Sequence, residues 1–153
     1  MKGRFARVRR WLDEILPRLT PEMMGWAPAE GMRTIGGQLG ELLWVEIPLV
    51  PWLKDGKRLS EEEVNERIGS EQDFEGLRKK LVETRAATLE YLDSLSEEEL
   101  AEEVPCGDAW FGTFWPASLP RAELFLNVSE HEFYHVGQLT SYLWSRGDDP
   151  YKW

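Results

Sequence analysis

The sequence predicts an all-α protein, a four-helix bundle, and two observations support this fold class. Four segments place apolar residues at alternating steps of three and four, the spacing that gives a helix one apolar face, and no segment shows a convincing strand of any length. Such helices bury their apolar faces against one another around a shared core. At 153 residues the chain is about the size of one domain, so we expect a single domain over residues 1–153.

The first two long helices are predicted over residues 4–17 and 35–52. The apolar spacing of the first helix ends at Pro17. A loop broken by proline and glycine separates the two helices, and Thr34 is predicted to cap the second one. Pro48 lies inside the second helix, so we expect its last turns to be kinked or weakened.

The second helix has an unusual composition. Its three glycines, Gly36, Gly37 and Gly40, lower its intrinsic stability by several tenths of a kcal/mol or more each. Glycines kept in a helix indicate that another segment packs very close to it. Two carboxylates follow them: Glu46 falls near the centre of the apolar stripe, and Glu41 lies toward its edge. Either carboxylate is predicted to face into the bundle.

Residues 54–72 predict a polar crossing, in which Ser60 and Glu63 form the capping box of a short helix. The third long helix is predicted over residues 74–95, with the most regular apolar stripe of the chain and no chemistry of its own. The loop 105–119 is rich in aromatic residues, which we expect to cap the core; a short hairpin closing the bundle and a lid over a pocket are the alternatives. These aromatic residues are Trp110, Phe111, Phe114 and Trp115.

The last helix is predicted to start near Ser118 or Pro120 and to stop at Arg146, and it holds both histidines of the chain, His131 and His135. At about 3.6 residues per turn, side chains four apart lie on one face of a helix. The rest of that face is apolar, so both imidazoles are predicted to point at the core.

Two interpretations of the histidine pair compete. Each imidazole is either a buried polar group satisfied by a backbone carbonyl or a hydroxyl, or one of two ligands of a divalent metal. Burying both without a strong partner would cost a few kcal/mol, whereas a metal accepts neutral imidazole at both positions of an i, i+4 pair. The spacing therefore favours metal binding, with a third ligand from another helix.

The composition excludes several kinds of partner. The formal net charge is −10, with 28 acidic against 18 basic residues, which argues against binding nucleic acid or an anionic membrane surface. The short basic cluster over residues 2–10 is expected to solvate one helix face. No apolar run approaches the roughly 20 residues that cross a bilayer, and the N-terminus lacks a signal-peptide core, so we expect a cytoplasmic protein. The single cysteine, Cys106, is interpreted as an incidental loop thiol.

Residues 131–135, HEFYH, match the H-E-x-x-H pattern of zinc proteases. Only 18 residues follow His135, and they contain no glutamate and no histidine to act as the usual third ligand. A peptidase cleft also needs a strand beside it, and none is predicted. The peptidase interpretation is therefore rejected.

The stretch HEFYHVGQLTSYLWSRGDDP resembles the closing signature of the DinB/YfiT-like proteins, in which the last helix of a four-helix bundle carries His-x3-His-x-Gly-Gln-Leu. The stretch RTIGGQLGELLWVE resembles the second helix of the same family, where a metal-binding histidine comes seven residues after a starting threonine or serine. In helix order and spacing the resemblance covers nearly the whole chain. It implies a bundle of the DinB/YfiT-like type.

This chain departs from that family at one ligand position, because Glu41 stands where members with three histidines have the third one. Carried over residue by residue, the resemblance implies a metal site of His131, His135 and Glu41. Two histidines and a carboxylate remain a competent set for zinc, nickel, iron or manganese. Glu46 matches the second-helix glutamate of the family and is the alternative third ligand, or a partner that orients a histidine.

The resemblance implies a metal-dependent transferase or hydrolase, with a low-molecular-weight thiol as a candidate substrate. Glu132 and Tyr134 are candidates for proton transfer, although Glu132 lies about 100° around the helix from His131, where a flanking position is the simpler interpretation. The alternative is a non-catalytic, stress-associated or structural bundle whose metal site is a remnant. Family resemblance, the eight tryptophans and the glycines of the second helix favour a homo-oligomer, a dimer or larger.

Overall fold

Four long helices form the body of the protein in the computed structural model, which describes residues 1–106 and 116–153. The all-α prediction is confirmed. The long helices are α1 (Lys2–Ile15), α2 (Ile35–Glu46), α5 (Phe74–Ser94) and α7 (Arg121–Ser145). Shorter elements connect them: η1 (Leu16–Arg18), η2 (Pro21–Met23), α3 (Leu49–Asp55), α4 (Glu61–Ile68), α6 (Glu97–Ala101), β1 (Glu103–Pro105), β2 (Ser118–Pro120) and, after α7, η5 (Pro150–Lys152).

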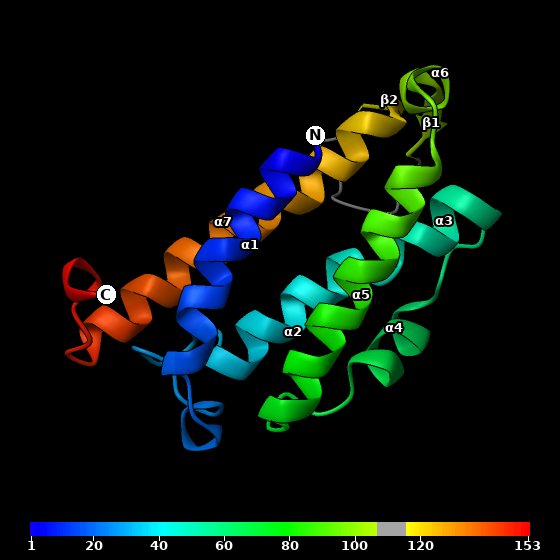
Figure 1. The fold of residues 1–153 in the computed structure, drawn as a ribbon. Helices are drawn as coiled ribbons and strands as arrows, with labels where there is room; N and C mark the ends of the chain where they lie inside the picture. Colours follow the sequence, from blue (N-terminus) through cyan, green and yellow to red (C-terminus); the bar gives the residue numbers. More distant parts are fainter. Residues whose placement is uncertain (107–115) are drawn as a thin grey trace.

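The long helices run as two parallel pairs. α1 and α7 lie side by side and point the same way (Figure 1), as the contacts of Arg4 with Glu130 and of Arg18 with Asp148 require. α2 and α5 form the second pair and run opposite to the first. Two parallel helices cannot be joined by a tight turn. The segment that contains α3 and α4, which follows α2 and precedes α5 in the sequence, therefore carries the chain back along the bundle. The polar crossing predicted over residues 54–72 is this connection.

Local signals set the ends of the helices as expected. Thr34 caps α2, because its Oγ1 accepts a hydrogen bond of 3.0 Å from the amide of Gly37. Ser60 and Glu63 form the predicted capping box of α4. Pro48 does more than kink the second helix: α2 ends at Glu46 and α3 starts at Leu49, so the predicted helix 35–52 is two helices.

The glycines of α2 serve close packing within the chain. A Cβ atom on Gly36 would lie 2.0 Å from the carbonyl oxygen of Glu71, and the Gly36 amide donates a hydrogen bond of 2.9 Å to the carbonyl of Met24. A Cβ atom on Gly40 would lie 3.5 Å from Oε1 of the Glu71 side chain. The loops before α2 and before α5 therefore rest directly on the α2 backbone. The close approach predicted from these glycines is confirmed, and it is intramolecular.

A short pairing of two three-residue strands leads into α7. β1 and β2 pair antiparallel, with Val104 opposite Leu119. The predicted aromatic cap, Trp110 to Trp115, lies outside the described residues. Cys106, directly after β1, is buried, and burial raises the pKa of its thiol. Among the described helices, none is both long and apolar enough to cross a membrane.

Gly36→Ala is expected to destabilise the protein by about 1–3 kcal/mol, because the added methyl group meets backbone atoms that cannot move without shifting the loop before α5. Urea unfolding followed by circular dichroism measures the change. Gly3→Ala is the matched control, since an added Cβ there meets nothing within 4 Å. This control is expected to be neutral or slightly stabilising; equal losses in both variants would contradict close packing at Gly36.

Candidate metal centre

The two histidines meet in the core on α7. Their Nε2 atoms are 3.0 Å apart and their ring centroids are 4.4 Å apart. His135 is 4% exposed and His131 is partly buried. The prediction that both imidazoles share one inward face of the helix is confirmed, and the i, i+4 spacing converges on a single point between the two Nε2 atoms.

Gln38 of α2 orients His135. The Nδ1 atom of His135 donates to Oε1 of Gln38, while Nε2 of Gln38 donates to the Tyr142 hydroxyl at 3.2 Å. That hydroxyl in turn donates to the backbone carbonyl of Arg33 at 2.9 Å. With its Nδ1 proton engaged, His135 presents the lone pair of Nε2 toward His131. Sequence reasoning missed Gln38, although it lies between the apolar positions Ile35 and Leu42 of the same stripe.

Burial lowers the pKa of both histidines to about 4, and the nearby Arg33 guanidinium acts in the same direction. For His135 the neighbouring His131 ring adds to the effect. Both imidazoles are therefore neutral near pH 7. Neutral imidazole is the form that binds a metal ion.

Glu41 lies toward the edge of the α2 stripe, as predicted, with 27% of its side chain exposed. Its Oε2 is 2.6 Å from Nη1 of Arg33, so the carboxylate is engaged in an ion pair. Within residues 1–106 and 116–153, no three His, Cys, Asp or Glu side chains are grouped closely enough to hold a metal ion. The structure thus brings His131 and His135 together and leaves Glu41 paired with Arg33.

Glu46, the alternative third ligand, is buried in a different cluster. Nε of Arg85 donates to its Oε1 at 2.6 Å, and Nη2 of Arg85 donates to its Oε2 at 3.0 Å. The same Nη2 also donates to Glu132, whose Oε1 lies 3.1 Å from Nε of Arg9. Both carboxylates of this cluster are committed to guanidinium groups.

These four charged side chains, which we call the charge layer, come from the four long helices: Arg9 from α1, Glu46 from α2, Arg85 from α5 and Glu132 from α7. Three of them are at most 5% exposed. Burial raises the pKa of Glu132, although Arg9 and Arg85 oppose the effect. The layer separates two apolar clusters of the core. On α5, for example, Leu81 belongs to one cluster and Leu92 to the other.

The charge layer corrects three sequence-based interpretations. Glu132 is 2% exposed, so the flanking position predicted for it is wrong. Arg9 belongs to the layer and not to a solvated helix face, and α5 carries a buried charge where only apolar packing was predicted. Arg85 lies four residues after Leu81 and three before Thr88 on the buried face. This position on the apolar face of the helix was the signal in the sequence that Arg85 is buried.

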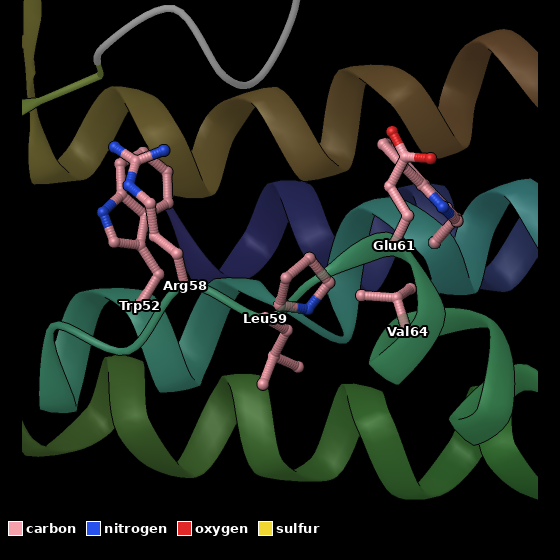
Figure 2. Close-up of a pocket in the computed structure, with 7 residues that line it drawn as sticks. Trp52, Arg58, Leu59, Glu61 and Val64 are labelled. Carbon is pink, nitrogen blue, oxygen red and sulfur yellow. The ribbon is translucent and has the colours of Figure 1, made fainter.

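Two hollows lie between α2 and the segment that contains α4. One, of about 380 Å³, is lined by Arg33, Glu41 and Trp44 together with residues of α4 and the turn after it. The other is an apolar hollow of about 100 Å³, with Trp52 and Arg58 at one end and Glu61 toward the other (Figure 2). Trp44 borders both hollows. Glu41 is thus reachable from solvent by a small molecule.

The fold and the site define an all-α bundle of four long helices with a pair of converging, neutral imidazoles in its core. The sequence matches the DinB superfamily over residues 4–139, a range that includes all four long helices in whole or in large part, and the chain belongs to this superfamily. Comparison with curated proteins and with solved structures finds no match.

The histidine pair predicts a loss of stability in mild acid. The two pKa values are about 4 in the folded protein and about 6.5 in an unfolded chain, so between these values the unfolded state binds protons that the folded state does not. The free energy of unfolding of metal-free protein is expected to fall by a few kcal/mol as the pH drops through this window. Urea unfolding at a series of pH values measures it.

His131→Gln/His135→Gln is the control for this pH dependence, because it removes both imidazoles and leaves every carboxylate in place. Its free energy of unfolding is expected to change less than that of the wild type over the same window. Identical slopes in the two proteins would contradict the burial of neutral imidazoles.

Arg85→Met is expected to destabilise the protein by about 3–5 kcal/mol, because it leaves Glu46 and Glu132 buried with too little positive charge. Urea unfolding at neutral pH measures the loss. Arg78→Met on the same helix is the control: Arg78 pairs with Glu75 at the surface, and its removal is expected to change stability by less than about 0.5 kcal/mol. A small effect at both positions would mean that the charge layer is dispensable.

Proposed function

We propose that this member of the DinB superfamily binds a divalent metal between α2 and α7 and uses it in a transfer or hydrolysis reaction. The observation that carries the proposal is the convergence of Nε2 of His131 and Nε2 of His135, 3.0 Å apart, on neutral rings. Buried imidazoles in this arrangement are suited to zinc, nickel, iron or manganese. In the competing interpretation, hydrogen bonding alone satisfies the pair: Nδ1 of His135 donates to Gln38, and Nε2 of His131 donates to Nε2 of His135 at 3.0 Å.

The distance between the two nitrogens fits one metal ion. With metal–nitrogen bonds of about 2.0–2.1 Å, the two imidazole nitrogens bound to the same ion lie about 2.8–3.4 Å apart for octahedral to tetrahedral angles. The observed 3.0 Å falls within this range. Gln38 supports the same role, because a hydrogen bond at Nδ1 orients the ring and strengthens Nε2 as a ligand.

Glu41 is the third ligand in this proposal. It stands at the position where the resemblance to the family implies a metal-binding histidine, and Glu46 is a weaker alternative because Arg85 holds both of its oxygens. Glu41 would exchange its ion pair with Arg33 for the metal. The positive charge of Arg33 disfavours a second cation nearby, so Arg33 lowers the affinity of the site.

The proposed chemistry follows from an open site of two histidines and one carboxylate. A divalent metal held in this way supplies Lewis acidity, which makes a thiol or a water molecule nucleophilic at neutral pH. Arg33, once released from Glu41, offers a guanidinium to a carboxylate of the substrate in the neighbouring hollow of about 380 Å³. A low-molecular-weight thiol that carries a carboxylate would be a suitable substrate. Glu132 is committed to Arg85, so Tyr134, whose ring centroid is 5.2 Å from that of His135, is the better candidate for proton transfer.

Protein purified without an affinity tag is expected to contain near one equivalent of metal by elemental analysis, and His135→Ala and Glu41→Ala are expected to lose it. Gln38→Leu is expected to weaken metal binding by about 10–100-fold through loss of the hydrogen bond to His135. Arg33→Met is expected to bind metal more tightly than the wild type, because it frees Glu41 and removes a nearby positive charge.

Glu130→Ala is the matched control, since Glu130 is an exposed carboxylate next to His131 in sequence that pairs with Arg4. Its metal content is expected to equal that of the wild type. Absence of metal after incubation with zinc, nickel, iron(II) and manganese would contradict the proposal, and so would metal that survives in His135→Ala.

The second candidate function is a non-catalytic, oligomeric bundle, stress-associated or structural, in which the Arg33–Glu41 ion pair replaces the metal permanently. The observation in its favour is a pair of exposed aromatic rings, Trp11 of α1 and Phe133 of α7, which contact each other. Phe133 lies between the two histidines in the sequence, but its side chain is directed outward. The metal titration separates the two functions.

A further inference from the structure

A hollow of about 480 Å³ lies between α5 and the junction of α2 with α3. This volume is typical of pockets that hold small organic molecules. On one side the hollow is bordered by Ile47, Val50 and Pro51. On the other side it is bordered by residues whose spacing puts them on one face of α5: Lys80, Glu83, Thr84, Ala87 and Thr88.

The break in the second helix accounts for the position of this hollow. α2 packs against α5 as far as Glu46, whose carboxylate accepts hydrogen bonds from Arg85. α2 ends there, and α3 starts at Leu49 after Pro48. Glu46 and Thr88 are the buried polar residues that border the hollow, at 3% and 0% exposure. The hollow thus combines apolar walls with a small number of polar groups, as ligand pockets do.

Two cations border the hollow, Arg67 of α4 and Lys80 of α5. Nζ of Lys80 donates a hydrogen bond of 2.7 Å to the carbonyl of Ile68, the residue that follows Arg67. This bond holds the end of α4 against α5 and brings both cations to the same end of the hollow. An ammonium group has three donors, so Lys80 keeps two for another partner.

The acidic residues that border the hollow leave these two cations without a counterion. Both oxygens of Glu46 are bonded to Arg85, and the exposed Glu83 lies 3.8 Å from Lys79. Within the part of the chain that the structure describes, Arg67 makes no ion pair. The protein has 28 acidic residues, and none of those described pairs with Arg67 or Lys80. Like charges brought together repel, so this end of the hollow favours an anion.

We propose that this hollow binds a small organic anion, a carboxylate with a short apolar body. The carboxylate lies between the two cations, and the apolar body lies along Ile47, Val50 and Ala87. Neither histidine borders the hollow, and Glu41 does not border it either. The binding site is therefore separate from the proposed metal centre, and the two proposals can fail independently.

A titration of the isotope-labelled protein with octanoate, followed by proton–nitrogen NMR at neutral pH, tests the proposal. Octanoate is expected to shift the amide signals of residues 46–51 and 83–88 in a saturable manner. Octanol has the same apolar body without the charge, and it is expected to bind about tenfold more weakly or worse. Acetate has the charge without the apolar body, and it is also expected to bind more weakly.

Ala87→Leu is expected to lower the affinity for octanoate by about tenfold or more, because the larger side chain fills the hollow. Its melting temperature is expected to change little, since Ala87 is exposed and leucine is a good helix former. Ala86→Leu is the matched control: Ala86 is also exposed on α5 but does not border the hollow. Its affinity for octanoate is expected to equal that of the wild type.

Arg67→Met is expected to lower the affinity for octanoate by about tenfold and to leave that for octanol unchanged. Arg10→Met is the control, because it removes the same charge from an exposed arginine of α1 that does not border the hollow. The absence of saturable shifts with octanoate overturns the proposal. Equal affinities for octanoate and octanol overturn it, and so does octanoate binding that survives Ala87→Leu and Arg67→Met.

Discussion

The charge layer is the constraint on which the rest of the structure depends. One charged side chain from each long helix enters the core, and the two guanidinium groups and two carboxylates balance in charge. Buried charges are costly unless they are paired with good geometry, so a shift of any one helix along its axis would leave an uncompensated charge in an apolar interior. Leucine and isoleucine side chains tolerate such shifts far better. The layer therefore fixes the register of all four helices, which apolar packing alone would leave open.

The histidine site follows from this register. Glu132 is held by Arg85 and Arg9, and it precedes the turn of α7 that carries His135. With α7 fixed in rotation and height, His131 and His135 face α2 at the level of Gln38, whose amide meets His135. The opposite face of the same helix turn carries Phe133, which contacts Trp11 of α1. A single turn of α7 thus contributes to the core, to the candidate metal centre and to the exposed surface.

The surroundings of the two imidazoles have opposing effects on a metal. Burial keeps both rings neutral and Gln38 orients one of them, which favours binding. Arg33 adds positive charge beside the site and occupies Glu41 through an ion pair that is partly exposed to solvent. Ion pairs of this kind contribute little net stability, about 0–1 kcal/mol, so exchanging Arg33 for a divalent ion is energetically accessible. The occupancy of the proposed metal site thus depends on a balance that Arg33 can shift.

The sequence by itself determined the helices, their caps and the inward face of the two histidines, because helix periodicity, capping residues and i, i+4 neighbours are local properties. Thr34, the capping box at Ser60 and the pairing of His131 with His135 are all of this kind. Only the tertiary structure decided which charges meet. Arg85 and Glu132 are 47 residues apart in the chain, and nothing in the periodicity of either helix names the other as a partner. Glu41 likewise pairs with Arg33 and not with the histidines, because folding brings the Arg33 side chain within reach of its carboxylate.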